Sequence, residues 1–579
     1  MKNAALSEVF GQMADIMEIL GEDRFRINSY RKVSRIIGDI PADIELLLET
    51  GRLADTPGIG KSSLAKIKEF IETGSITAHQ ELLAKIPPNL LDLLRIPGMG
   101  PKGVKAVYDN LNVVGIADLS RAIETGTLVQ LPGFGEKKAA LIARGIAFLE
   151  KSAGRIRLDQ ALEAAETVGA TLRSYSELLK IQTAGSFRRR AETIGDVDIL
   201  VGVAGQEDSS KRIIEAFTKA PFVKEVLASG STKGSAIIET STCDVQVDVR
   251  VVSEKSFGAA LQYFTGSKAH NVRLREIAVK KKLKLNEYGL FKGDKIIAGA
   301  AEQQIYEKLG LDYILPVLRE DRGEIEAAIA HSLPEPVKFT DIKGDFHMHT
   351  VASDGENDIE ALAEAAAQMG YKFICITDHS HSLAIANGLS PKQLGWQIKH
   401  IRKVNEKLKG ITVLAGTEVD ILSDGSLDFD NELLADLDFV IASIHLGQGG
   451  AGEEITMRTL KAMDNPFVNC IAHPTGRLIG RREPMNIDIA AVIEHAAQTH
   501  TALEVNANPW RLDLKDTHCK MAIDKGVKLA LGTDAHSASA LGLMGFGVAT
   551  AARGWAKKPD ILNTFTVPKI KSFVKTKRP

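Results

Sequence analysis

The spacing of apolar residues divides the chain into four zones. Apolar residues recur at helical spacing through residues 1–150, where three short glycine motifs interrupt them. Residues 155–335 mix helical stretches with alternating β-branched runs such as DILVGV and CDVQVDVRVV, which are typical of strands. The stretch 331–344 has two prolines and few large apolar residues, and is expected to be a linker. From Gly344 onward, short apolar runs alternate with helical segments, which predicts an α/β barrel or layered sheet.

Length and composition restrict the class of protein. At roughly 100–200 residues per domain, 579 residues predict about three to five domains. A content of 44% hydrophobic and 25% charged residues is that of a globular protein. No apolar run approaches the ~18 residues of a membrane span, and we expect the N-terminus to be an amphipathic helix rather than a signal peptide. The four cysteines are far apart, which argues against a disulfide framework and favours a reducing cytoplasm.

The net charge of the chain says little about its function, whereas the positions of its histidines are informative. The chain has 72 Lys+Arg and 74 Asp+Glu, so its net charge of -2 does not indicate a nucleic-acid-binding protein. Of the 14 histidines, only His79, His270 and His331 precede residue 341. Because histidine is the commonest metal ligand, this distribution suggests that the two halves of the chain have different chemistry.

A Gly-x-Gly motif occurs three times within residues 1–150, each time between two helical segments and with a lysine close behind it. Paired glycines let a turn bring backbone N–H groups close to an anion at a helix N-terminus. One such turn is a common structural device, but three favour helix-hairpin-helix motifs that contact DNA phosphates independently of sequence. The expected DNA-binding glycines are Gly58, Gly60, Gly98, Gly100, Gly133 and Gly135.

The segment Asn28-Ser29-Tyr30-Arg31-Lys32, followed by the first hairpin, resembles the small N-terminal domain of DNA polymerase beta. In that family, a lysine six residues beyond the second hairpin glycine forms a Schiff base with a 5′-deoxyribose phosphate. Lys66 has this spacing from Gly60, although Ser62 stands where the family has a supporting lysine and Phe25 where it has a phosphate-binding histidine. The resemblance implies a lyase role for Lys66, and a solvated helix lysine is the alternative.

Three aspartates follow the pattern of a two-metal centre. Asp196 and Asp198 are two apart on a predicted strand, so both carboxylates face the same side. A later strand with alternating valines places Asp248 on its polar side. Like charges placed together are costly unless a cation lies between them. Three carboxylates on adjacent strands can hold two divalent ions, here Mg²⁺ or Mn²⁺, and would make these aspartates the catalytic residues of nucleotidyl transfer.

A glycine-serine pair and an arginine cluster, residues 185–190, precede these aspartates. Gly185 and Ser186 would bring hydrogen-bond donors to a triphosphate, and Arg189 would neutralise it. Together with the aspartates, this arrangement resembles the nucleotidyltransferase palm, and specifically family X DNA polymerases.

The resemblance to family X continues beyond the palm. In the family, an aromatic pair lies against the incoming sugar, an asparagine contacts the minor groove of the base, and an arginine lies near the template. The matching nucleotide-binding positions are Tyr263, Phe264, Gly266, Asn271 and Arg275. Residues 268–295 carry nine Lys+Arg against three acids, which suits template phosphates, although a solvated helix face explains part of this charge.

Nine candidate metal ligands lie in the second half, and nearly every one directly follows a short apolar run. Spacings of about 25–40 residues leave room for one helix between runs, and the C-terminal ends of barrel strands converge on one mouth. Six imidazoles and three carboxylates suit zinc, manganese or iron. The candidates are His347, His349, Asp354, His379, Glu418, His445, His473, Asp534 and His536.

This pattern resembles the polymerase-and-histidinol-phosphatase (PHP) domain, a distorted seven-stranded α/β barrel with a trinuclear metal site. By resemblance, one ion would take His347, His349, Glu418 and Asp534. A second would take Glu418, His445 and His473, and a third Asp354, His379 and His536. Arg477 is either a phosphate anchor or a surface arginine, and a role beside the metals or the substrate is conceivable for Glu504, Asn506 and Trp510.

Together the two resemblances predict a multidomain protein. It would have helical N-terminal helix-hairpin-helix domains, an α+β nucleotidyltransferase palm with a thumb, and a C-terminal distorted (β/α)7 barrel. The expected ranges are 1–88 for a lyase-like domain, 89–152 for a second hairpin domain, 153–256 for the palm, 257–330 for the thumb, 331–343 for a linker and 344–579 for the PHP barrel.

The function implied by the resemblance is that of a monomeric, cytoplasmic DNA repair polymerase. It would use gapped or primer-template DNA and deoxynucleoside triphosphates, with Mg²⁺ or Mn²⁺ in the palm. Up to three Zn²⁺, Mn²⁺ or Fe²⁺ ions in the barrel would support a 3′-5′ exonuclease. The alternatives for the barrel are a 3′-phosphatase, an abasic-site endonuclease or a small-molecule phosphatase, and the alternative for the whole chain is a non-catalytic DNA-binding scaffold.

Overall fold

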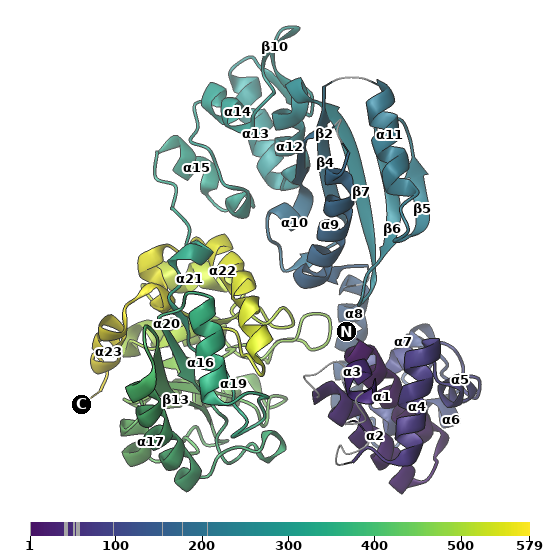
Figure 1. Ribbon diagram of the computed structural model, residues 1–579, viewed down its shortest axis with the longest axis vertical. Helices are drawn as coiled ribbons and strands as arrows, with labels where there is room; N and C mark the ends of the chain where they lie inside the picture. Colours follow the sequence, from purple (N-terminus) through teal and green to yellow (C-terminus); the bar gives the residue numbers. More distant parts are fainter. Residues whose placement is uncertain are drawn as a thin grey trace. The chain divides into compact units, whose positions relative to one another are not determined.

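The computed structural model describes residues 2–39, 44–49, 53, 58–96, 98–152, 154–175, 178–204 and 207–578 (Figure 1). The chain forms two compact units. One unit is Met1–Ala153 together with Gly480–Glu483, and the other is Gly154–Ile479 together with Pro484–Pro579. In the described parts of the chain, no helix is long and apolar enough to cross a membrane.

Helices make up the first unit. The apolar residues predicted to share a face are buried in one core that includes Phe10, Met13, Ile67, Val104 and Phe134. Burial of such helical stripes supplies most of the stability of short helices, which are marginal on their own. The α-helices are α1 (Lys2–Leu20), α2 (Arg24–Asp39), α3 (Ile44–Glu49), α4 (Lys61–Thr73), α5 (Thr77–Leu83), α6 (Pro101–Leu111), α7 (Ile116–Glu124) and α8 (Glu136–Ser152).

The second unit begins with the palm, a five-stranded sheet of order β2-β4-β7-β6-β5. Its central strands β4 and β7 are parallel, and the other pairs are antiparallel. Helices α9 (Leu158–Arg173) and α11 (Glu207–Thr218) cover the sheet face that carries Val197, Ile199 and Val201. The alternation predicted from the sequence is therefore confirmed. The strands are β2 (Leu178–Thr183), β4 (Val197–Val203), β5 (Val223–Ser229), β6 (Lys233–Glu239) and β7 (Asp244–Ser253).

The thumb follows the palm with its own small core. Buried residues that include Leu274, Leu290, Ile305 and Tyr306 join its helices to a three-stranded antiparallel sheet. Its elements are α12 (Phe257–Thr265), α13 (Lys268–Lys280), β8 (Lys284–Asn286), β9 (Gly289–Lys292), β10 (Lys295–Ala298), α14 (Glu302–Leu309) and α15 (Glu324–Ile329).

The C-terminal part is a barrel of seven parallel strands in sequential order. All of its strands except the first residue of β13 are buried, as expected for a parallel sheet covered by helices. Backbone hydrogen bonds from Asp534 to His347 and from His349 to Ala535 join the last strand region to the first. The strands are β11 (Gly344–Asp345), β12 (Phe373–Ile376), β13 (Thr412–Asp420), β14 (Phe439–Ser443), β15 (Cys470–Ile471), β16 (Ala502–Asn506) and β17 (Leu529–Gly532).

Helices cover the outside of the barrel, and the segment 331–343 packs onto it. Two branched apolar side chains of this proline-containing segment, Val337 and Ile342, are buried in the barrel core. The expected architecture of helical domains, palm, thumb and seven-stranded barrel is confirmed. The helices are α16 (Ile359–Gln368), α17 (Pro391–Lys407), α18 (Asn431–Ala435), α19 (Gly452–Asp464), α20 (Ile489–Thr499), α21 (Asp516–Asp524), α22 (Met544–Arg553) and α23 (Val567–Lys575).

Candidate active sites

The three palm aspartates come together at the start of β4 and in the middle of β7. Asp198 and Asp248 are register partners of these parallel strands, and Asp196 directly precedes β4. One carboxylate oxygen from each lies within 4.8 Å of the others, a spacing that suits bound cations. No other carboxylate or histidine of the described palm shares this cluster.

The electrostatics of the three carboxylates differ. Burial, and then repulsion by Asp196 and Asp248, raise the pKa of Asp198 to about 7. Burial also acts to raise the pKa of Asp248, but hydrogen bonds from Lys233, Ser235 and Gln246 outweigh it and lower the pKa. The Lys233 ammonium lies 2.8 Å from Asp248 Oδ2. The cluster therefore attracts positive charge, which divalent cations would supply.

The segment that precedes the aspartates is fitted closely to them. Gly185 has φ +61°, and a Cβ there would lie 2.5 Å from Asp198 Oδ2, so this position requires glycine. Gly185 and Ser186 begin the short helix α10 (Gly185–Arg188). Arg189 follows it and donates from Nε to Glu320 Oε1 at 2.9 Å and from Nη1 to the Thr265 carbonyl at 2.6 Å. Three of the five guanidinium N–H groups remain for a ligand.

The expected nucleotide-binding residues of the thumb lie on α12 and α13. The rings of Tyr263 and Phe264 meet edge to face at 5.2 Å, and both side chains are partly exposed. The Asn271 amide donates to the Tyr263 carbonyl at 2.7 Å and accepts from Gln262 at 2.7 Å, so the protein already satisfies it on both sides. Gly266 is buried beside Arg189, and Arg275 is partly exposed.

The three glycine motifs adopt the turn that their sequence predicts. The first glycine of each has positive φ, +99° at Gly58, +87° at Gly98 and +83° at Gly133. The second glycine of each (Gly60, Gly100 and Gly135) directly precedes α4, α6 or α8, and the apolar residue between each pair is buried. Each motif therefore leaves a helix N-terminus available to a phosphate.

Lys66 lies on α4, nearly two turns beyond Gly60. Its Nζ donates to Ser62 Oγ at 3.0 Å and lies 5.8 Å from the centre of the Tyr30 ring. Phe25 is 87% exposed. Among the described residues the Lys66 ammonium forms no salt bridge, although the Glu69 carboxylate on the same helix is close enough to interact with its charge.

All nine candidate ligands of the barrel converge at the C-terminal ends of its strands. Eight of them form three overlapping groups, each with ligand atoms within 4.8 Å of one another, and the ninth, His473, contacts Glu418. The groups differ from the expected sets. His349 also joins the Asp354 group and His379 joins the Glu418 group, whereas Glu418 is missing from the His347 group and His473 is missing from all three. The groups are His349, Asp354, His379 and His536; His347, His349 and Asp534; and His379, Glu418 and His445.

Glu418 lies at the centre of the barrel cluster. Its oxygens lie 2.9 Å from His379 Nδ1 and 2.9 Å from His473 Nε2. Although Glu418 Oε2 and His379 Nδ1 are this close, neither buried atom forms a hydrogen bond, and buried His349 Nδ1 forms none either. Buried polar atoms without partners are costly, so these side chains fit metal ions that would accept their lone pairs.

The charges in the barrel mouth are strongly coupled. Burial acts to lower the pKa of His347, but Glu504, Glu418 and Asp534 outweigh it and raise that pKa well above its usual value. Burial and neighbouring histidines lower the pKa of His349 to about 3. A neutral imidazole beside anionic carboxylates is the form of a ligand set that binds divalent metals.

Two carboxylates support the ligands from behind. Glu504 Oε1 lies 2.6 Å from His347 Nδ1, and Asp420 Oδ1 lies 3.0 Å from His445 Nδ1. Such carboxylates fix the tautomer and orientation of a metal-binding histidine. The sequence interpretation overlooked Asp420, although its position two residues after Glu418 on the same strand places it on the same face.

Arg477 is neither on the surface nor free. It is 8% exposed and donates to Glu192 at 2.6 Å and to the carbonyls of Arg511 and Leu512. The arginine that reaches the metal cluster is instead Arg511, whose Nε lies 3.3 Å from Asp534 Oδ2. No spacing in the sequence distinguishes these two arginines.

Models of known families match most of the chain. They are a helix-hairpin-helix domain (residues 1–76), a SAM-like helix-hairpin-helix tandem (90–147), the DNA polymerase beta palm (155–252), the DNA polymerase beta thumb (260–320) and the PHP domain (345–507).

Similarity to individual proteins extends over the whole chain. The DNA polymerase/3′-5′ exonuclease PolX of Bacillus subtilis (strain 168) is 37% identical over 565 residues, which is 97% of this chain and 97% of that protein. A probable phosphatase of Thermoanaerobacter sp. (strain X514) is 30% identical over 245 residues, which is 40% of this chain and 95% of that protein. A probable phosphatase of Clostridium acetobutylicum is 32% identical over 209 residues, 34% of this chain and 80% of that protein. With its palm, thumb and metal-binding barrel, the chain belongs to the family X DNA polymerases that carry a C-terminal PHP domain.

Proposed function

We propose that this protein fills short gaps in DNA by metal-dependent nucleotidyl transfer in its palm and trims the same DNA as a 3′-5′ exonuclease in its barrel. The observation that carries the proposal is the cluster of Asp196, Asp198 and Asp248 in a chain similar over its length to a DNA polymerase/3′-5′ exonuclease. The substrates would be gapped or primer-template DNA and deoxynucleoside triphosphates, bound by a monomer.

In the palm, the three aspartates would hold Mg²⁺ or Mn²⁺. The bound cations would supply Lewis acidity for attack by a primer 3′-hydroxyl and would neutralise charge on the triphosphate. Lys233 and Ser235 hold the Asp248 carboxylate in place. Gly185 and Ser186 offer backbone donors, and the N–H groups of Arg189 that are not bound by Glu320 or Thr265 would neutralise a triphosphate.

In the barrel, the nine ligands would hold up to three Zn²⁺, Mn²⁺ or Fe²⁺ ions. Glu504 and Asp420 keep His347 and His445 oriented with their Nε2 atoms toward Glu418. Arg511 is placed beside Asp534, where its guanidinium would neutralise a phosphodiester.

A second candidate function for the barrel is phosphatase activity on small molecules, because probable phosphatases match this part of the chain alone. Asp196→Ala, Asp198→Ala protein incubated with end-labelled DNA tests both proposals. We expect the label to be released as mononucleotides from the 3′ end. An intact strand, with hydrolysis of a small phosphate ester, would support the phosphatase instead. Failure of the unsubstituted protein to extend a primer with either metal would support a DNA-binding scaffold.

A further inference from the structure

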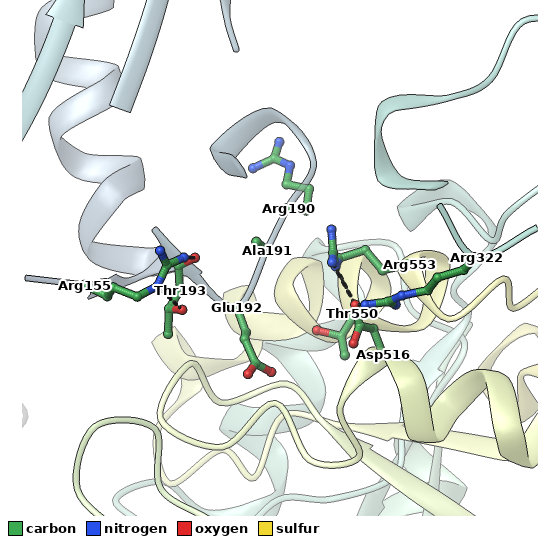
Figure 2. A pocket seen from close by; sticks show the side chains of 9 residues that line it. All are labelled: Arg155, Arg190, Ala191, Glu192, Thr193, Arg322, Asp516, Thr550 and Arg553. Carbon is green, nitrogen blue, oxygen red and sulfur yellow. Dashed lines mark hydrogen bonds and ion pairs between the residues drawn. The ribbon is translucent and has the colours of Figure 1, made fainter. Parts of the chain in front are cut away.

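A cavity of about 180 Å³ lies where the palm meets the thumb and the barrel (Figure 2). One side is the palm loop 190–193 with Arg155, and the other side is formed by the start of α21 and the end of α22 with Arg322 of the thumb. The volume equals about six water molecules at ~30 Å³ each, which is enough for the oxygens of one phosphate group. The lining residues are Arg155, Arg190, Ala191, Glu192, Thr193, Arg322, Asp516, Thr550 and Arg553.

Positive charge exceeds negative charge in this lining. Asp516 Oδ2 is shared by Arg553 at 2.8 Å and Arg322 at 3.0 Å. Glu192 is paired with Arg477, which is outside the lining. Among the residues that the structure describes, Arg155 donates only to the hydroxyl and carbonyl of Thr193. The lining therefore has four guanidinium groups and two carboxylates. Both carboxylates are already engaged, and Arg553 also pairs with Glu320 outside the lining at 2.9 Å.

Arg190 is the guanidinium without an anionic partner. Among the described residues it has no ion pair or side-chain hydrogen bond, and its guanidinium carbon lies 5.5 Å from the centre of the Phe187 ring. Desolvation lowers the pKa of Arg190, and no neighbouring carboxylate opposes this effect. Its backbone has φ +57°, a conformation that costs a non-glycine residue about 1–2 kcal/mol. Arg190 is exposed, and no described side chain occupies its guanidinium donors.

We propose that this cavity binds a phosphate group, with Arg190 and Arg155 as its ligands. Guanidinium groups recognise phosphate oxygens through paired N–H donors, and Thr193 adds a hydroxyl. A DNA strand phosphate and a free phosphate ion share this chemistry. The proposal that the phosphate belongs to a DNA strand rests on the proposed function, because it requires that the protein binds DNA.

The position of the cavity in the chain favours a DNA strand. Loop 190–193 runs from the arginine cluster to Asp196 of the palm cluster. On the barrel side, Glu192 binds Arg477, four residues beyond the metal ligand candidate His473. The cavity therefore lies between a segment of one centre and a segment of the other. A strand whose 3′ end moves between the two centres would place a phosphate there.

Salt dependence of DNA binding tests the proposal in the full-length protein. The affinity for a duplex with an unpaired 3′ end is measured by fluorescence anisotropy in EDTA, so that neither centre can act. Each contact with a single-stranded phosphate contributes about 0.7 to the slope of log K against log salt. Arg190→Gln should lower the slope by about 0.7, and Arg190→Gln with Arg155→Gln by about 1.4. Between 50 and 200 mM salt, the single variant would then lose about 2.6-fold less affinity than the unsubstituted protein, and the double variant about sevenfold less.

Arg173→Gln is the matched control, because it removes one exposed arginine of the same palm outside the cavity. Arg190→Lys should keep the slope. A second arm measures the rise in Tm caused by inorganic phosphate at constant ionic strength. If the DNA slopes are unchanged but this rise is lost in the double variant, the ligand is a free phosphate ion.

Slopes and phosphate response equal to those of Arg173→Gln would overturn the proposal. If the unsubstituted protein does not bind DNA at all, the proposed function fails instead, and the phosphate arm alone decides whether the cavity is a site.

Discussion

The carboxylate of Glu302 lies beneath the arginine cluster and is bound by two guanidinium groups. Arg188 donates to both of its oxygens, at 2.9 and 2.7 Å, and Arg319 donates to Oε1 at 2.7 Å. Glu302 is 4% exposed and Arg319 is fully buried. The substitution Glu302→Gln would leave both arginines without a compensating charge, in a site from which water is excluded.

The cost can be worked out from the electrostatics of the site. Burial acts to raise the pKa of Glu302, but Arg319 and Arg188 outweigh it and lower the pKa from 4.5 to about 2. A shift of about 2.5 units, at about 1.36 kcal/mol per unit, corresponds to roughly 3 kcal/mol of stability at neutral pH. This agrees with the ~3–5 kcal/mol expected when one partner of a buried ion pair is removed. We therefore expect Glu302→Gln to destabilise the thumb by about 3 kcal/mol.

The pH dependence has a defined sign. The pKa of Glu302 is depressed in the folded state, so its contribution is complete above pH 4.5 and is lost as the pH falls toward about 2. At pH 3 about 1.4 kcal/mol would remain, so the difference between the unsubstituted protein and Glu302→Gln should shrink by roughly 2 kcal/mol between pH 7 and pH 3.

Hydrogen exchange followed by mass spectrometry measures the local stability of the thumb in the full-length protein. Amides of α14 should exchange about 150-fold faster in Glu302→Gln at pH 7, which corresponds to about 3 kcal/mol. Glu307→Gln, on the exposed side of the same helix, is the control and should change exchange little. An acceleration below about fivefold in Glu302→Gln would refute the reasoning, because it would mean that the two arginines keep their stability without the carboxylate.

Three further predictions concern the separate centres. Asp248→Asn should abolish primer extension and spare nuclease activity, whereas Asp244→Asn on the same strand, exposed and paired with Lys224, should change neither. The double variant His347→Ala, His349→Ala should bind less metal, as measured by elemental analysis. It should lose DNA hydrolysis and keep primer extension, and His400→Ala, at an exposed histidine, is the control. Loss of both activities in either folded variant would contradict two independent centres. Borohydride should trap a 5′-deoxyribose phosphate end on the unsubstituted protein but not on Lys66→Ala. The exposed Lys68→Ala is the control, and an equal adduct on Lys66→Ala would exclude Lys66 as the lyase residue.

Local patterns in the sequence were sufficient to predict the elements and the metal-ligand candidates. Nearly every barrel ligand follows an apolar run, and the C-terminal ends of parallel barrel strands meet at one mouth. Glu418 and Asp534 were therefore recognisable without knowledge of the barrel closure. The alternation around Asp198 likewise predicted which side of β4 faces the helices.

Long-range pairing could not be predicted in this way. Arg189 is bound by Glu320, 131 residues away, and Glu320 is shared with Arg553, a further 233 residues along the chain. No periodicity connects these positions, because their pairing depends on how the palm, thumb and barrel pack. The burial of Arg319 could not be predicted either. Arginine is usually exposed, but the residues around Arg319 bury it completely. The exact metal groups also depend on side-chain directions, which is why His379 lies close to Glu418 as well as to Asp354.

The three consecutive arginines of the palm loop connect these observations, because each one points to a different partner. Arg188 binds Glu302 of the thumb, Arg189 binds Glu320, and Arg190 lines the cavity beside the barrel. The chain can separate them because α10 ends at Arg188 and the backbone turns to φ +57° at Arg190. The pair between Arg188 and Glu302 fixes the start of this turn. If it positions the whole loop, Glu302→Gln should also lower the salt slope of DNA binding through Arg190, although Glu302 does not line the cavity. An unchanged slope in Glu302→Gln would show that Arg189 and its shared contact with Arg553 hold the loop without the thumb pair.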